Sequence, residues 1–251
     1  MFNLKKVIKA RKTLERVTSL LFKLFQIKLR YKEKRPDYGI EIFEYFYLPW
    51  KSDDEFLAKY DLISEFTLNP KSRLYTVYEM SKKYLLDNTS FVEVGSWKGG
   101  VTGLVALTNK DKNIDYYSCD TFAGVVNSSE KDSFFKNSEY SDALPSDVKK
   151  VSEIVNTNLN IVEGIFPQSM NSINIKNPIS FAHIDVDTYI SAKESLEFIS
   201  KNGSKGCLVV LDDYGGWFTD GVTKYGNELK FSEDFFVVPN HLGQLLIYKL
   251  N

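Results

Sequence analysis

One stretch, SFVEVGSWKGGVTG at residues 90–103, constrains the fold of this chain more than any other. It reads as a short apolar strand, then a glycine-rich turn, then the start of a helix. In such a turn, backbone N–H groups can approach a bound small molecule closely, and the following helix N-terminus adds a partial positive charge. Gly95, Gly99 and Gly100 permit this approach because they carry no Cβ. The stretch therefore predicts a small-molecule site at the end of a strand.

Strand and helix patterns alternate after this turn, which favours an α/β fold with a mostly parallel sheet and helices on both faces. Further strands are expected at 115–120, 160–166, 179–185 and 207–211, and a closing antiparallel hairpin at 235–239 and 244–250, which makes seven strands in all. Helices are expected at 72–87, after the glycine turn, at 148–155 and from near Tyr189 to Phe198. Residues 124–150 have little periodicity before their last few positions and are interpreted as a lid.

Charge divides the chain into two parts. Residues 1–35 hold 12 of the 32 Lys and Arg and only two acids, a balance of about +10, so the other residues carry 20 basic against 31 acidic side chains. Apolar residues near helical spacing predict a basic amphipathic arm at 1–35, ahead of a domain at 36–251. The arm could pack against a second copy of the chain, contact anionic lipid at the inner face of a membrane, or remain disordered. A homodimer is the favoured expectation.

Other partners and locations follow from composition. The basic residues gather in the arm without a base-reading motif, so no nucleic-acid partner is expected. The sequence has no recognisable signal peptide and no apolar run of the roughly 18 residues that a membrane span needs. Cys119 and Cys207 lie in apolar strand-like runs and are expected to be buried thiols. These features predict a cytoplasmic protein.

Acidic residues end several predicted strands. They are Asp120, Glu163, Asp185, Asp187, Asp212 and Asp213. Because the carboxyl ends of parallel strands meet at one edge of the sheet, several carboxylates would converge there and repel one another unless a divalent cation bridged them. Asp185, Asp212 and Asp213 are the candidate metal ligands, and Asp120, one strand from the glycine turn, is the candidate acceptor for the hydroxyls of a ribose.

Each of these residues also has a structural interpretation. A single Asp at a strand end often caps the next helix, and Asp187 could cap the helix that begins near Tyr189. His183 lies two residues before Asp185, on the same side of its strand, and could be either a core histidine or a proton acceptor. Tyr45, Tyr47 and Trp50, in an aromatic-rich segment, could cover the edge of the core or line a substrate mouth.

Five motifs, in this order, resemble one enzyme family. FVEVGSWKGG, CDTFAG, VEGIFPQSM, HIDVDTYISAKESL and VVLDDYGGW are similar to the macrocin O-methyltransferase type of class I S-adenosylmethionine-dependent enzymes, over residues 72–227. The resemblance implies a Rossmann-like methyltransferase that uses S-adenosylmethionine and Mg²⁺ to methylate a sugar hydroxyl. Trp97 stands where the general methyltransferase pattern has its middle glycine, which narrows the likeness to the macrocin group.

The resemblance also implies roles for individual residues. Glu93, Gly95 and Ser96 would hold the methionine part of the cofactor, Asp120 the ribose, and residues 163–165 would lie near the adenine. The full expected cofactor set is Glu93, Gly95, Ser96, Trp97, Gly99, Asp120, Thr121, Glu163, Gly164, Ile165 and Asp185. The candidate metal ligands match those of the family.

The expected chemistry is methyl transfer in line with a sugar hydroxyl. Two neighbouring hydroxyls could chelate one Mg²⁺, which would lower the pKa of the reacting hydroxyl, and Asp185 or His183 would take its proton. Tyr189, Tyr214, Trp217 and Tyr225 are expected to contact a substrate, or else only to shape the loop after the fifth strand. A nucleotide-linked or polysaccharide-bound sugar is the expected acceptor.

Three alternatives stay open at the level of the sequence. Residues 185–187, Asp-Val-Asp, match the DxD element with which many glycosyltransferases hold a metal and a sugar nucleotide. A catechol-type O-methyltransferase would use the same ligand geometry. A non-catalytic binding module could keep the cofactor fold and use the basic arm as a docking helix.

Overall fold

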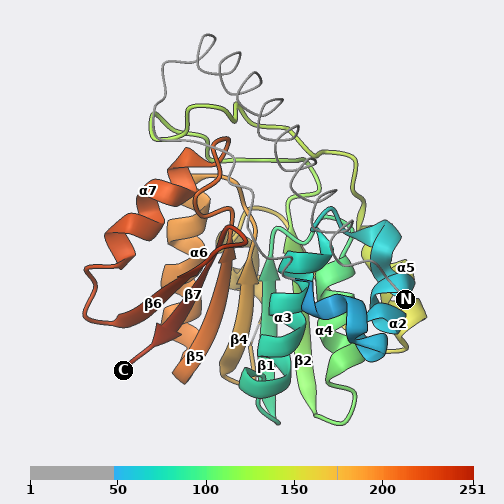
Figure 1. Cartoon of the computed structure of the whole chain (residues 1–251). Helices are drawn as coiled ribbons and strands as arrows, with labels where there is room; N and C mark the ends of the chain where they lie inside the picture. Colours follow the sequence, from blue (N-terminus) through green and yellow to red (C-terminus); the bar gives the residue numbers. More distant parts are fainter. Residues whose placement is uncertain (1–47, 174) are drawn as a thin grey trace, which may run out of the picture. The chain divides into compact units, whose positions relative to one another are not determined.

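The computed structural model describes residues 48–173 and 175–251. Their centre is a seven-stranded sheet in the order β3-β2-β1-β4-β5-β7-β6 (Figure 1). The strands are β1 Thr89–Val94, β2 Ile114–Asp120, β3 Leu159–Glu163, β4 Ile179–Ile184, β5 Gly203–Asp212, β6 Phe235–Asn240 and β7 Gln244–Lys249. The predicted arm at 1–35, with Tyr45 and Tyr47, lies outside the described residues.

The pairing of the strands confirms the predicted sheet. β1 to β5 pair in parallel, and β7 pairs antiparallel with both β5 and β6. The chain runs outward from β1 to β2 and β3, then returns to place β4 on the other side of β1. The connection after β1 therefore leads toward one edge of the sheet, and the connection after β4 leads toward the other. Between β1 and β4 this opens a crevice at the carboxyl ends of the strands, where ligands bind in such sheets.

Helices cover both faces of the sheet. α2 Asp54–Ile63, α3 Lys71–Tyr84, α4 Gly100–Thr108 and α5 Pro145–Val155 belong to one face, and α6 Tyr189–Asn202 and α7 Asp220–Leu229 to the other. Short 3₁₀ turns lie at Pro49–Ser52, Ser64–Phe66 and Gln168–Ser172. The sequence patterns predicted α3, α4, α5 and α6, whereas α2 and α7 were not expected. In the part of the chain described, no helix is long and apolar enough to cross a membrane.

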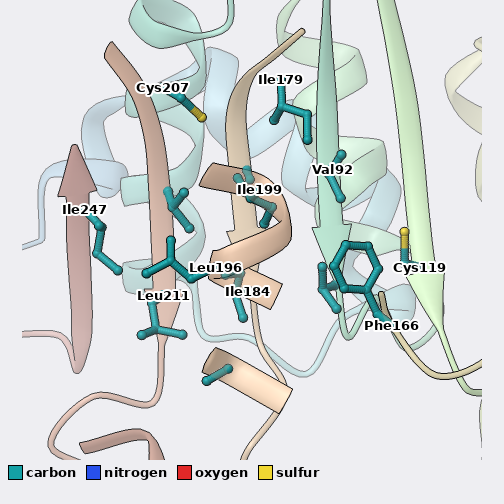
Figure 2. Packing of buried hydrophobic residues seen from close by; sticks show 14 of the residues in the cluster. Val92, Cys119, Phe166, Ile179, Ile184, Leu196, Ile199, Cys207, Leu211 and Ile247 are labelled. Atoms are coloured by element: carbon teal, nitrogen blue, oxygen red, sulfur yellow. The ribbon is translucent and has the colours of Figure 1, made fainter. Parts of the chain in front are cut away.

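Alternating side chains of the buried strands supply two cores. In β1, Phe91 packs on the side of α3 and α4, and Val92 packs on the side of α6. Figure 2 shows Leu196 and Ile199 of α6 against the sheet in the second core. Each fully buried side chain of this size stabilises the fold by about 1.5–3 kcal/mol. These two cores hold the strand ends in place around the crevice.

The two cysteines belong to the same α6-side core. Cys119 and Cys207 are free thiols with 0% and 1% of their surface exposed, which confirms that they are buried (Figure 2).

Candidate functional site

A cavity of about 440 Å³ lies at the carboxyl ends of β1, β2 and β4. The predicted site residues that line it are Glu93, Gly95, Ser96, Trp97, Asp120, Thr121, Gly164, Asp185 and Asp213. Gly99, Glu163, Ile165, His183 and Asp212 belong to the predicted site but do not line the cavity. The ends of the strands that carry the predicted site residues thus surround one cavity. This cavity lies where the strand order opens a crevice between β1 and β4.

The turn after β1 closes against the end of β4. Gly95 has φ +82°, and a Cβ on this residue would lie 1.8 Å from the backbone oxygen of Asp185. Only glycine fits both the backbone angle and the contact. This close approach brings the turn after β1 and the first candidate metal ligand to the same side of the cavity.

Asp120 ends β2 on the opposite side of the turn. Its Oδ2 accepts a hydrogen bond of 2.7 Å from the backbone N–H of Trp97, and its Oδ1 accepts one of 2.8 Å from Phe122. Burial raises the pKa of Asp120, and these two donors only partly oppose the shift. A carboxylate has about four lone-pair sites, so two remain for the hydroxyls of a ligand.

Trp97 connects the turn after β1 to the predicted lid. Its indole Nε1–H donates to Oδ1 of Asp142 at 2.9 Å, and the neighbouring Lys98 places its Nζ 3.4 Å from the other oxygen of Asp142. Residues 121–144 contain no regular helix or strand, and α5 begins at Pro145. The predicted lid at 124–150 is therefore a loop together with the first residues of α5.

The lid is attached to the N-termini of α6 and α7. Asp132, which is buried, accepts a hydrogen bond from the backbone N–H of Tyr189 at 2.9 Å, and Asp220 accepts one from the backbone N–H of Ser133 at 2.9 Å. The prediction that Asp187 caps α6 is wrong, because Asp132 of the lid takes that place. Asp187 instead lines the cavity with φ +62°.

Carboxylates converge where β4 and β5 end. One carboxylate oxygen each from Asp185 and Asp212 and one ring nitrogen of His183 lie within 4.8 Å of one another. Asp213 pairs with Arg73, whose Nη1 is 2.9 Å from Oδ1 of Asp213. Partial burial and the charge of Asp213 raise the pKa of Asp185 and of Asp187 well above the ordinary range. The carboxylates at this edge of the sheet therefore repel one another, which favours a positive charge among them.

His183 connects this group to β1. Its Nδ1 is 3.2 Å from Oε1 of Glu93 on β1, and its Nε2 is 3.3 Å from Oδ2 of Asp212 on β5. The second oxygen of Glu93 accepts the backbone N–H of Thr102, in the first turn of α4, at 2.8 Å. Burial alone would lower the pKa of His183, but the Asp212 and Glu93 carboxylates outweigh it and raise this pKa well above its ordinary value.

The donor set at the ends of β4 and β5 fits a divalent cation. Oδ2 of Asp212 is buried and has no hydrogen-bond partner among the described residues, as is expected of an oxygen that faces a cation. Carboxylate oxygens suit Mg²⁺, which also keeps several waters, and one imidazole nitrogen suits other divalent metals as well. His183, Asp185 and Asp212 form the candidate metal group that the described residues contain.

The sequence profile of a known enzyme family covers most of this chain. The profile described as Macrocin-O-methyltransferase (TylF) matches residues 64–241. This chain belongs to the macrocin O-methyltransferase family. It is an S-adenosylmethionine-dependent O-methyltransferase, as the five motifs implied. The match to this family therefore favours a methyltransferase over the alternative of a glycosyltransferase with a DxD element.

Solved structures have the same fold. The O-methyltransferase NovP is 16% identical and covers 74% of this chain and 83% of its own, with a TM-score of 0.60. CalS11, a calicheamicin methyltransferase, is 16% identical and covers 85% of this chain and 98% of its own, with a TM-score of 0.55. An O-methyltransferase from Bacillus cereus in complex with SAH is 12% identical over 80% of this chain and 92% of its own, with a TM-score of 0.51. No curated protein sequence matches the chain.

Several residues of this family enzyme's site were not predicted. Asn69 donates from Nδ2 to Oδ2 of Asp185 at 2.8 Å, Arg73 pairs with Asp213, and Tyr140 of the lid lines the cavity. Gln244 donates from Nε2 to Oδ1 of Asp212 at 2.5 Å. Asn69-Pro70 marked only a break in the chain, and Arg73 is one of several charged residues on α3, so neither gave a signal of its role.

The predicted substrate aromatics do not line the cavity. Tyr189 and Tyr225 are buried against each other between α6 and α7, with ring centroids 5.6 Å apart. The Tyr214 hydroxyl donates to Asn227 of α7 at 2.8 Å. Trp217 is 40% exposed, on the loop after β5. Trp50, the described member of the aromatic-rich segment, is partly buried near Tyr75 of α3.

Proposed function

We propose that this enzyme transfers a methyl group from S-adenosylmethionine to a sugar hydroxyl and uses Mg²⁺ to do so. One observation carries the proposal. A single cavity is bounded by Asp120, a partly buried carboxylate with two free lone-pair sites, and by the carboxylates at the ends of β4 and β5. The first suits the ribose of the cofactor, and the second suits a cation that binds an acceptor hydroxyl.

The cofactor would lie across the ends of β1 and β2. Asp120 accepts the two ribose hydroxyls, while Glu93, Gly95 and Ser96 border the methionine part. Trp97 and Gly99 would shape this turn, with Thr121 beside Asp120, and Glu163, Gly164 and Ile165 would flank the adenine. Ser96 supports this arrangement, because its buried hydroxyl lines the cavity without a hydrogen-bond partner among the described residues.

Asp185 and Asp212 would hold Mg²⁺, with Asp213 beside them. Bound Mg²⁺ would lower the pKa of the acceptor hydroxyl and fix its direction. Asp213 also carries the ion pair with Arg73, which limits the negative charge of the site. His183 bridges Glu93 and Asp212 below the cavity and orients the carboxylate of Asp212.

Asp185 is our first candidate for the base, and His183 the second. Asp185 lines the cavity, and Asn69 binds one of its oxygens and so fixes its direction. The acceptor oxygen forms a bond to the methyl carbon as the carbon–sulfur bond breaks, its proton passes to the base, and S-adenosylhomocysteine leaves as a neutral thioether. Residues 124–126 and Tyr140 of the lid line the cavity, so the lid would exclude water during this step.

The acceptor would be a nucleotide-linked or polysaccharide-bound sugar. The macrocin-type resemblance and the diol-binding chemistry of a cation at this site support a sugar. Trp217 and Tyr214, which follow the two acids at the end of β5, would contact the acceptor, while Tyr189 and Tyr225 would support that wall from α6 and α7.

Calorimetric titration with S-adenosylhomocysteine, with and without Mg²⁺, tests this proposal on the wild type and on Asp120→Ala. The wild type is expected to bind, and the variant to bind roughly 10-fold to 150-fold more weakly, because hydrogen bonds to charged groups contribute about 1.5–3 kcal/mol. Methyl transfer to a panel of sugar nucleotides then identifies the acceptor class. A wild type that binds no S-adenosylhomocysteine would refute the proposal.

The basic arm gives the protein its proposed partners. We propose that the chain works in the cytoplasm as a homodimer, and that residues 1–35 also contact the anionic inner face of a membrane. Light scattering of the full chain measures the oligomeric state. Co-sedimentation with phosphatidylglycerol vesicles, against phosphatidylcholine vesicles, measures lipid contact, which is expected to weaken with added salt.

A further inference from the structure

The turn between β6 and β7 reaches the carboxylates of the site. Gln244, the first residue of β7, is the pairing partner of Asp212 on β5. Its Nε2 donates to Oδ1 of Asp212 at 2.5 Å, and both side chains are buried, at 0% and 1% exposure. A hydrogen bond to a carboxylate in such a dry setting is strong and directional.

The amide of Gln244 has one orientation. Its Oε1 accepts a hydrogen bond from Nδ2 of Asn240 at 2.9 Å. The amide of Asn240 is fixed in turn, because its Oδ1 accepts the backbone N–H groups of Leu242 at 2.9 Å and of Gln244 at 3.1 Å. The backbone of the turn thus determines that the NH₂ group of Gln244 faces Asp212, which can only accept.

This contact leaves the two oxygens of Asp212 unequal. Oδ1 is occupied by Gln244, and Oδ2, which has no hydrogen-bond partner, lies 3.3 Å from Nε2 of His183. The buried carboxylate cannot rotate without breaking its bond to Gln244. Oδ2, which has only ion-pair distances, of 3.3 Å to His183 and 3.8 Å to Nη1 of Arg73, is therefore the oxygen left without a hydrogen bond for a cation.

The same turn also holds the partner of Asp213. The backbone oxygen of Leu242 accepts Nε of Arg73 at 3.0 Å, and Nη1 of Arg73 binds Asp213 at 2.9 Å. Gly243 has φ +80°, and a Cβ there would lie 2.8 Å from Nη2 of Arg73. The turn accordingly orients Asp212 through Gln244 and Asp213 through Arg73.

We propose that Gln244 is a positioning residue for the metal site, and that it acts by holding Asp212 with Oδ2 directed to the cation. The proposal rests on the proposed function, because it needs a cation at Asp185 and Asp212. Gln244 and Gly243 both lie beyond residues 64–241, where the family profile ends, so the profile does not assign this role.

Titration of the full-length, cofactor-free protein with Mn²⁺, followed by electron paramagnetic resonance, tests the proposal. Gln244→Leu is expected to weaken Mn²⁺ binding about 10-fold to 100-fold, as is typical when the hydrogen-bond partner of a metal ligand is removed. Its affinity for S-adenosylhomocysteine is expected to stay within about threefold of the wild type, because Asp120 lies at the other side of the cavity. In the methyl-transfer assay the variant should need more Mg²⁺, with an unchanged KM for the cofactor.

Two further variants make the outcome unambiguous. Ile247→Val removes one methylene from a fully buried side chain of the same strand and controls for a general weakening of β7, so it should bind Mn²⁺ like the wild type. Gln244→Glu keeps the shape of the side chain, places a second carboxylate against Asp212, and should weaken Mn²⁺ binding and alter the Mn²⁺ line shape even if Gln244→Leu does not fold.

The contrary outcomes are distinct. Folded Gln244→Leu or Gln244→Glu protein that binds Mn²⁺ as the wild type does would overturn the role of Gln244 and leave the proposed function intact. An equal loss in Ile247→Val would also overturn it, because the effect would then belong to the strand. A wild type that binds S-adenosylhomocysteine but no Mn²⁺ would instead remove the metal from the proposed function, and this inference with it.

Discussion

At the scale of single residues, Gly95 has the least freedom to change. Gly95→Ala would place a Cβ against the backbone oxygen of Asp185 and hold alanine at φ +82°. We expect a loss of unfolding free energy above the roughly 1–3 kcal/mol that a strained backbone alone costs, together with a loss of cofactor binding.

Gly206→Ala is the matched control for this variant. Gly206 also has a positive φ, of +78°, but a Cβ there would meet no atom within 4 Å. It should therefore show the backbone strain without the clash. Denaturant unfolding compares the two variants, and equal losses would contradict the account of Gly95.

The proposed role of Asp120 predicts that cofactor affinity depends on pH. Its pKa is raised by burial above the value of about 3.9 that is ordinary for Asp. The proposed hydrogen bonds from the ribose hydroxyls need the charged carboxylate, which exists above this pKa. Acidification through the raised pKa should therefore weaken the binding of S-adenosylhomocysteine. The weakening should begin at a higher pH than it would with an Asp of ordinary pKa. Calorimetry between pH 7 and 4.5 measures the effect. Asp120→Asn should bind weakly with no such slope, and a slope that persists in it would assign the titration to another group.

The sequence located the strand-end acids but not their partners. Asp120, Asp185, Asp212 and Asp213 could be predicted because each follows a recognisable apolar strand, and parallel strands end at one edge. The partners Asn69, Arg73 and Gln244 come from 116, 140 and 32 positions away, and no local pattern encodes such contacts. Asp187 was misassigned for the same reason, because the residue that caps α6 comes from the lid.

At the scale of elements, we expect the hydrogen bonds of Asp132 to hold the lid against the N-terminus of α6. Asp132→Ala would remove the acceptor for the backbone N–H groups of Ser129 and Tyr189. Each group left without a partner costs about 1–3 kcal/mol, so amide hydrogen exchange in residues 121–144 should accelerate, and S-adenosylhomocysteine should dissociate faster. Lys136→Ala, at an exposed lid position, is the control. Unchanged exchange in Asp132→Ala would mean that Asp132 does not hold the lid.

Of the two helices that the sequence patterns missed, α2 and α7, the second contains two glycines in a short helix. Gly221 and Gly226 lower the helix propensity of α7. The close packing of the helix requires both glycines. A Cβ on Gly226 would lie 2.6 Å from the ring of Tyr214, and a Cβ on Gly221 would lie 1.8 Å from Asp132. The strands and α6, by contrast, were predictable from unbroken apolar patterns. Tertiary contact overrides propensity where an element packs unusually close.

At the scale of the whole molecule, excess negative charge at the strand ends should make the fold sensitive to cations. Mg²⁺ that binds only the folded chain stabilises it by about 2.7 kcal/mol at a hundred times its Kd, so thermal unfolding should shift upward with Mg²⁺ and downward with a chelator. Asp212→Asn should lose most of the shift, because it removes one of the grouped ligands. A wild-type transition that does not respond to Mg²⁺ would contradict a cation site.

The strand order has a consequence for how the enzyme forms during synthesis. β7 lies between β5 and β6 although it follows both in the chain, so the edge of β5 stays unpaired until β7 has been made. N-terminal segments generally fold first as a chain emerges from the ribosome. The cofactor turn and Asp120 can therefore take shape while Asp212 still lacks its neighbour on β7. On the proposed function, we therefore expect a nascent chain to bind the methyl donor before its acidic centre is complete, and chains that stop short of β7 should bind the donor without using it.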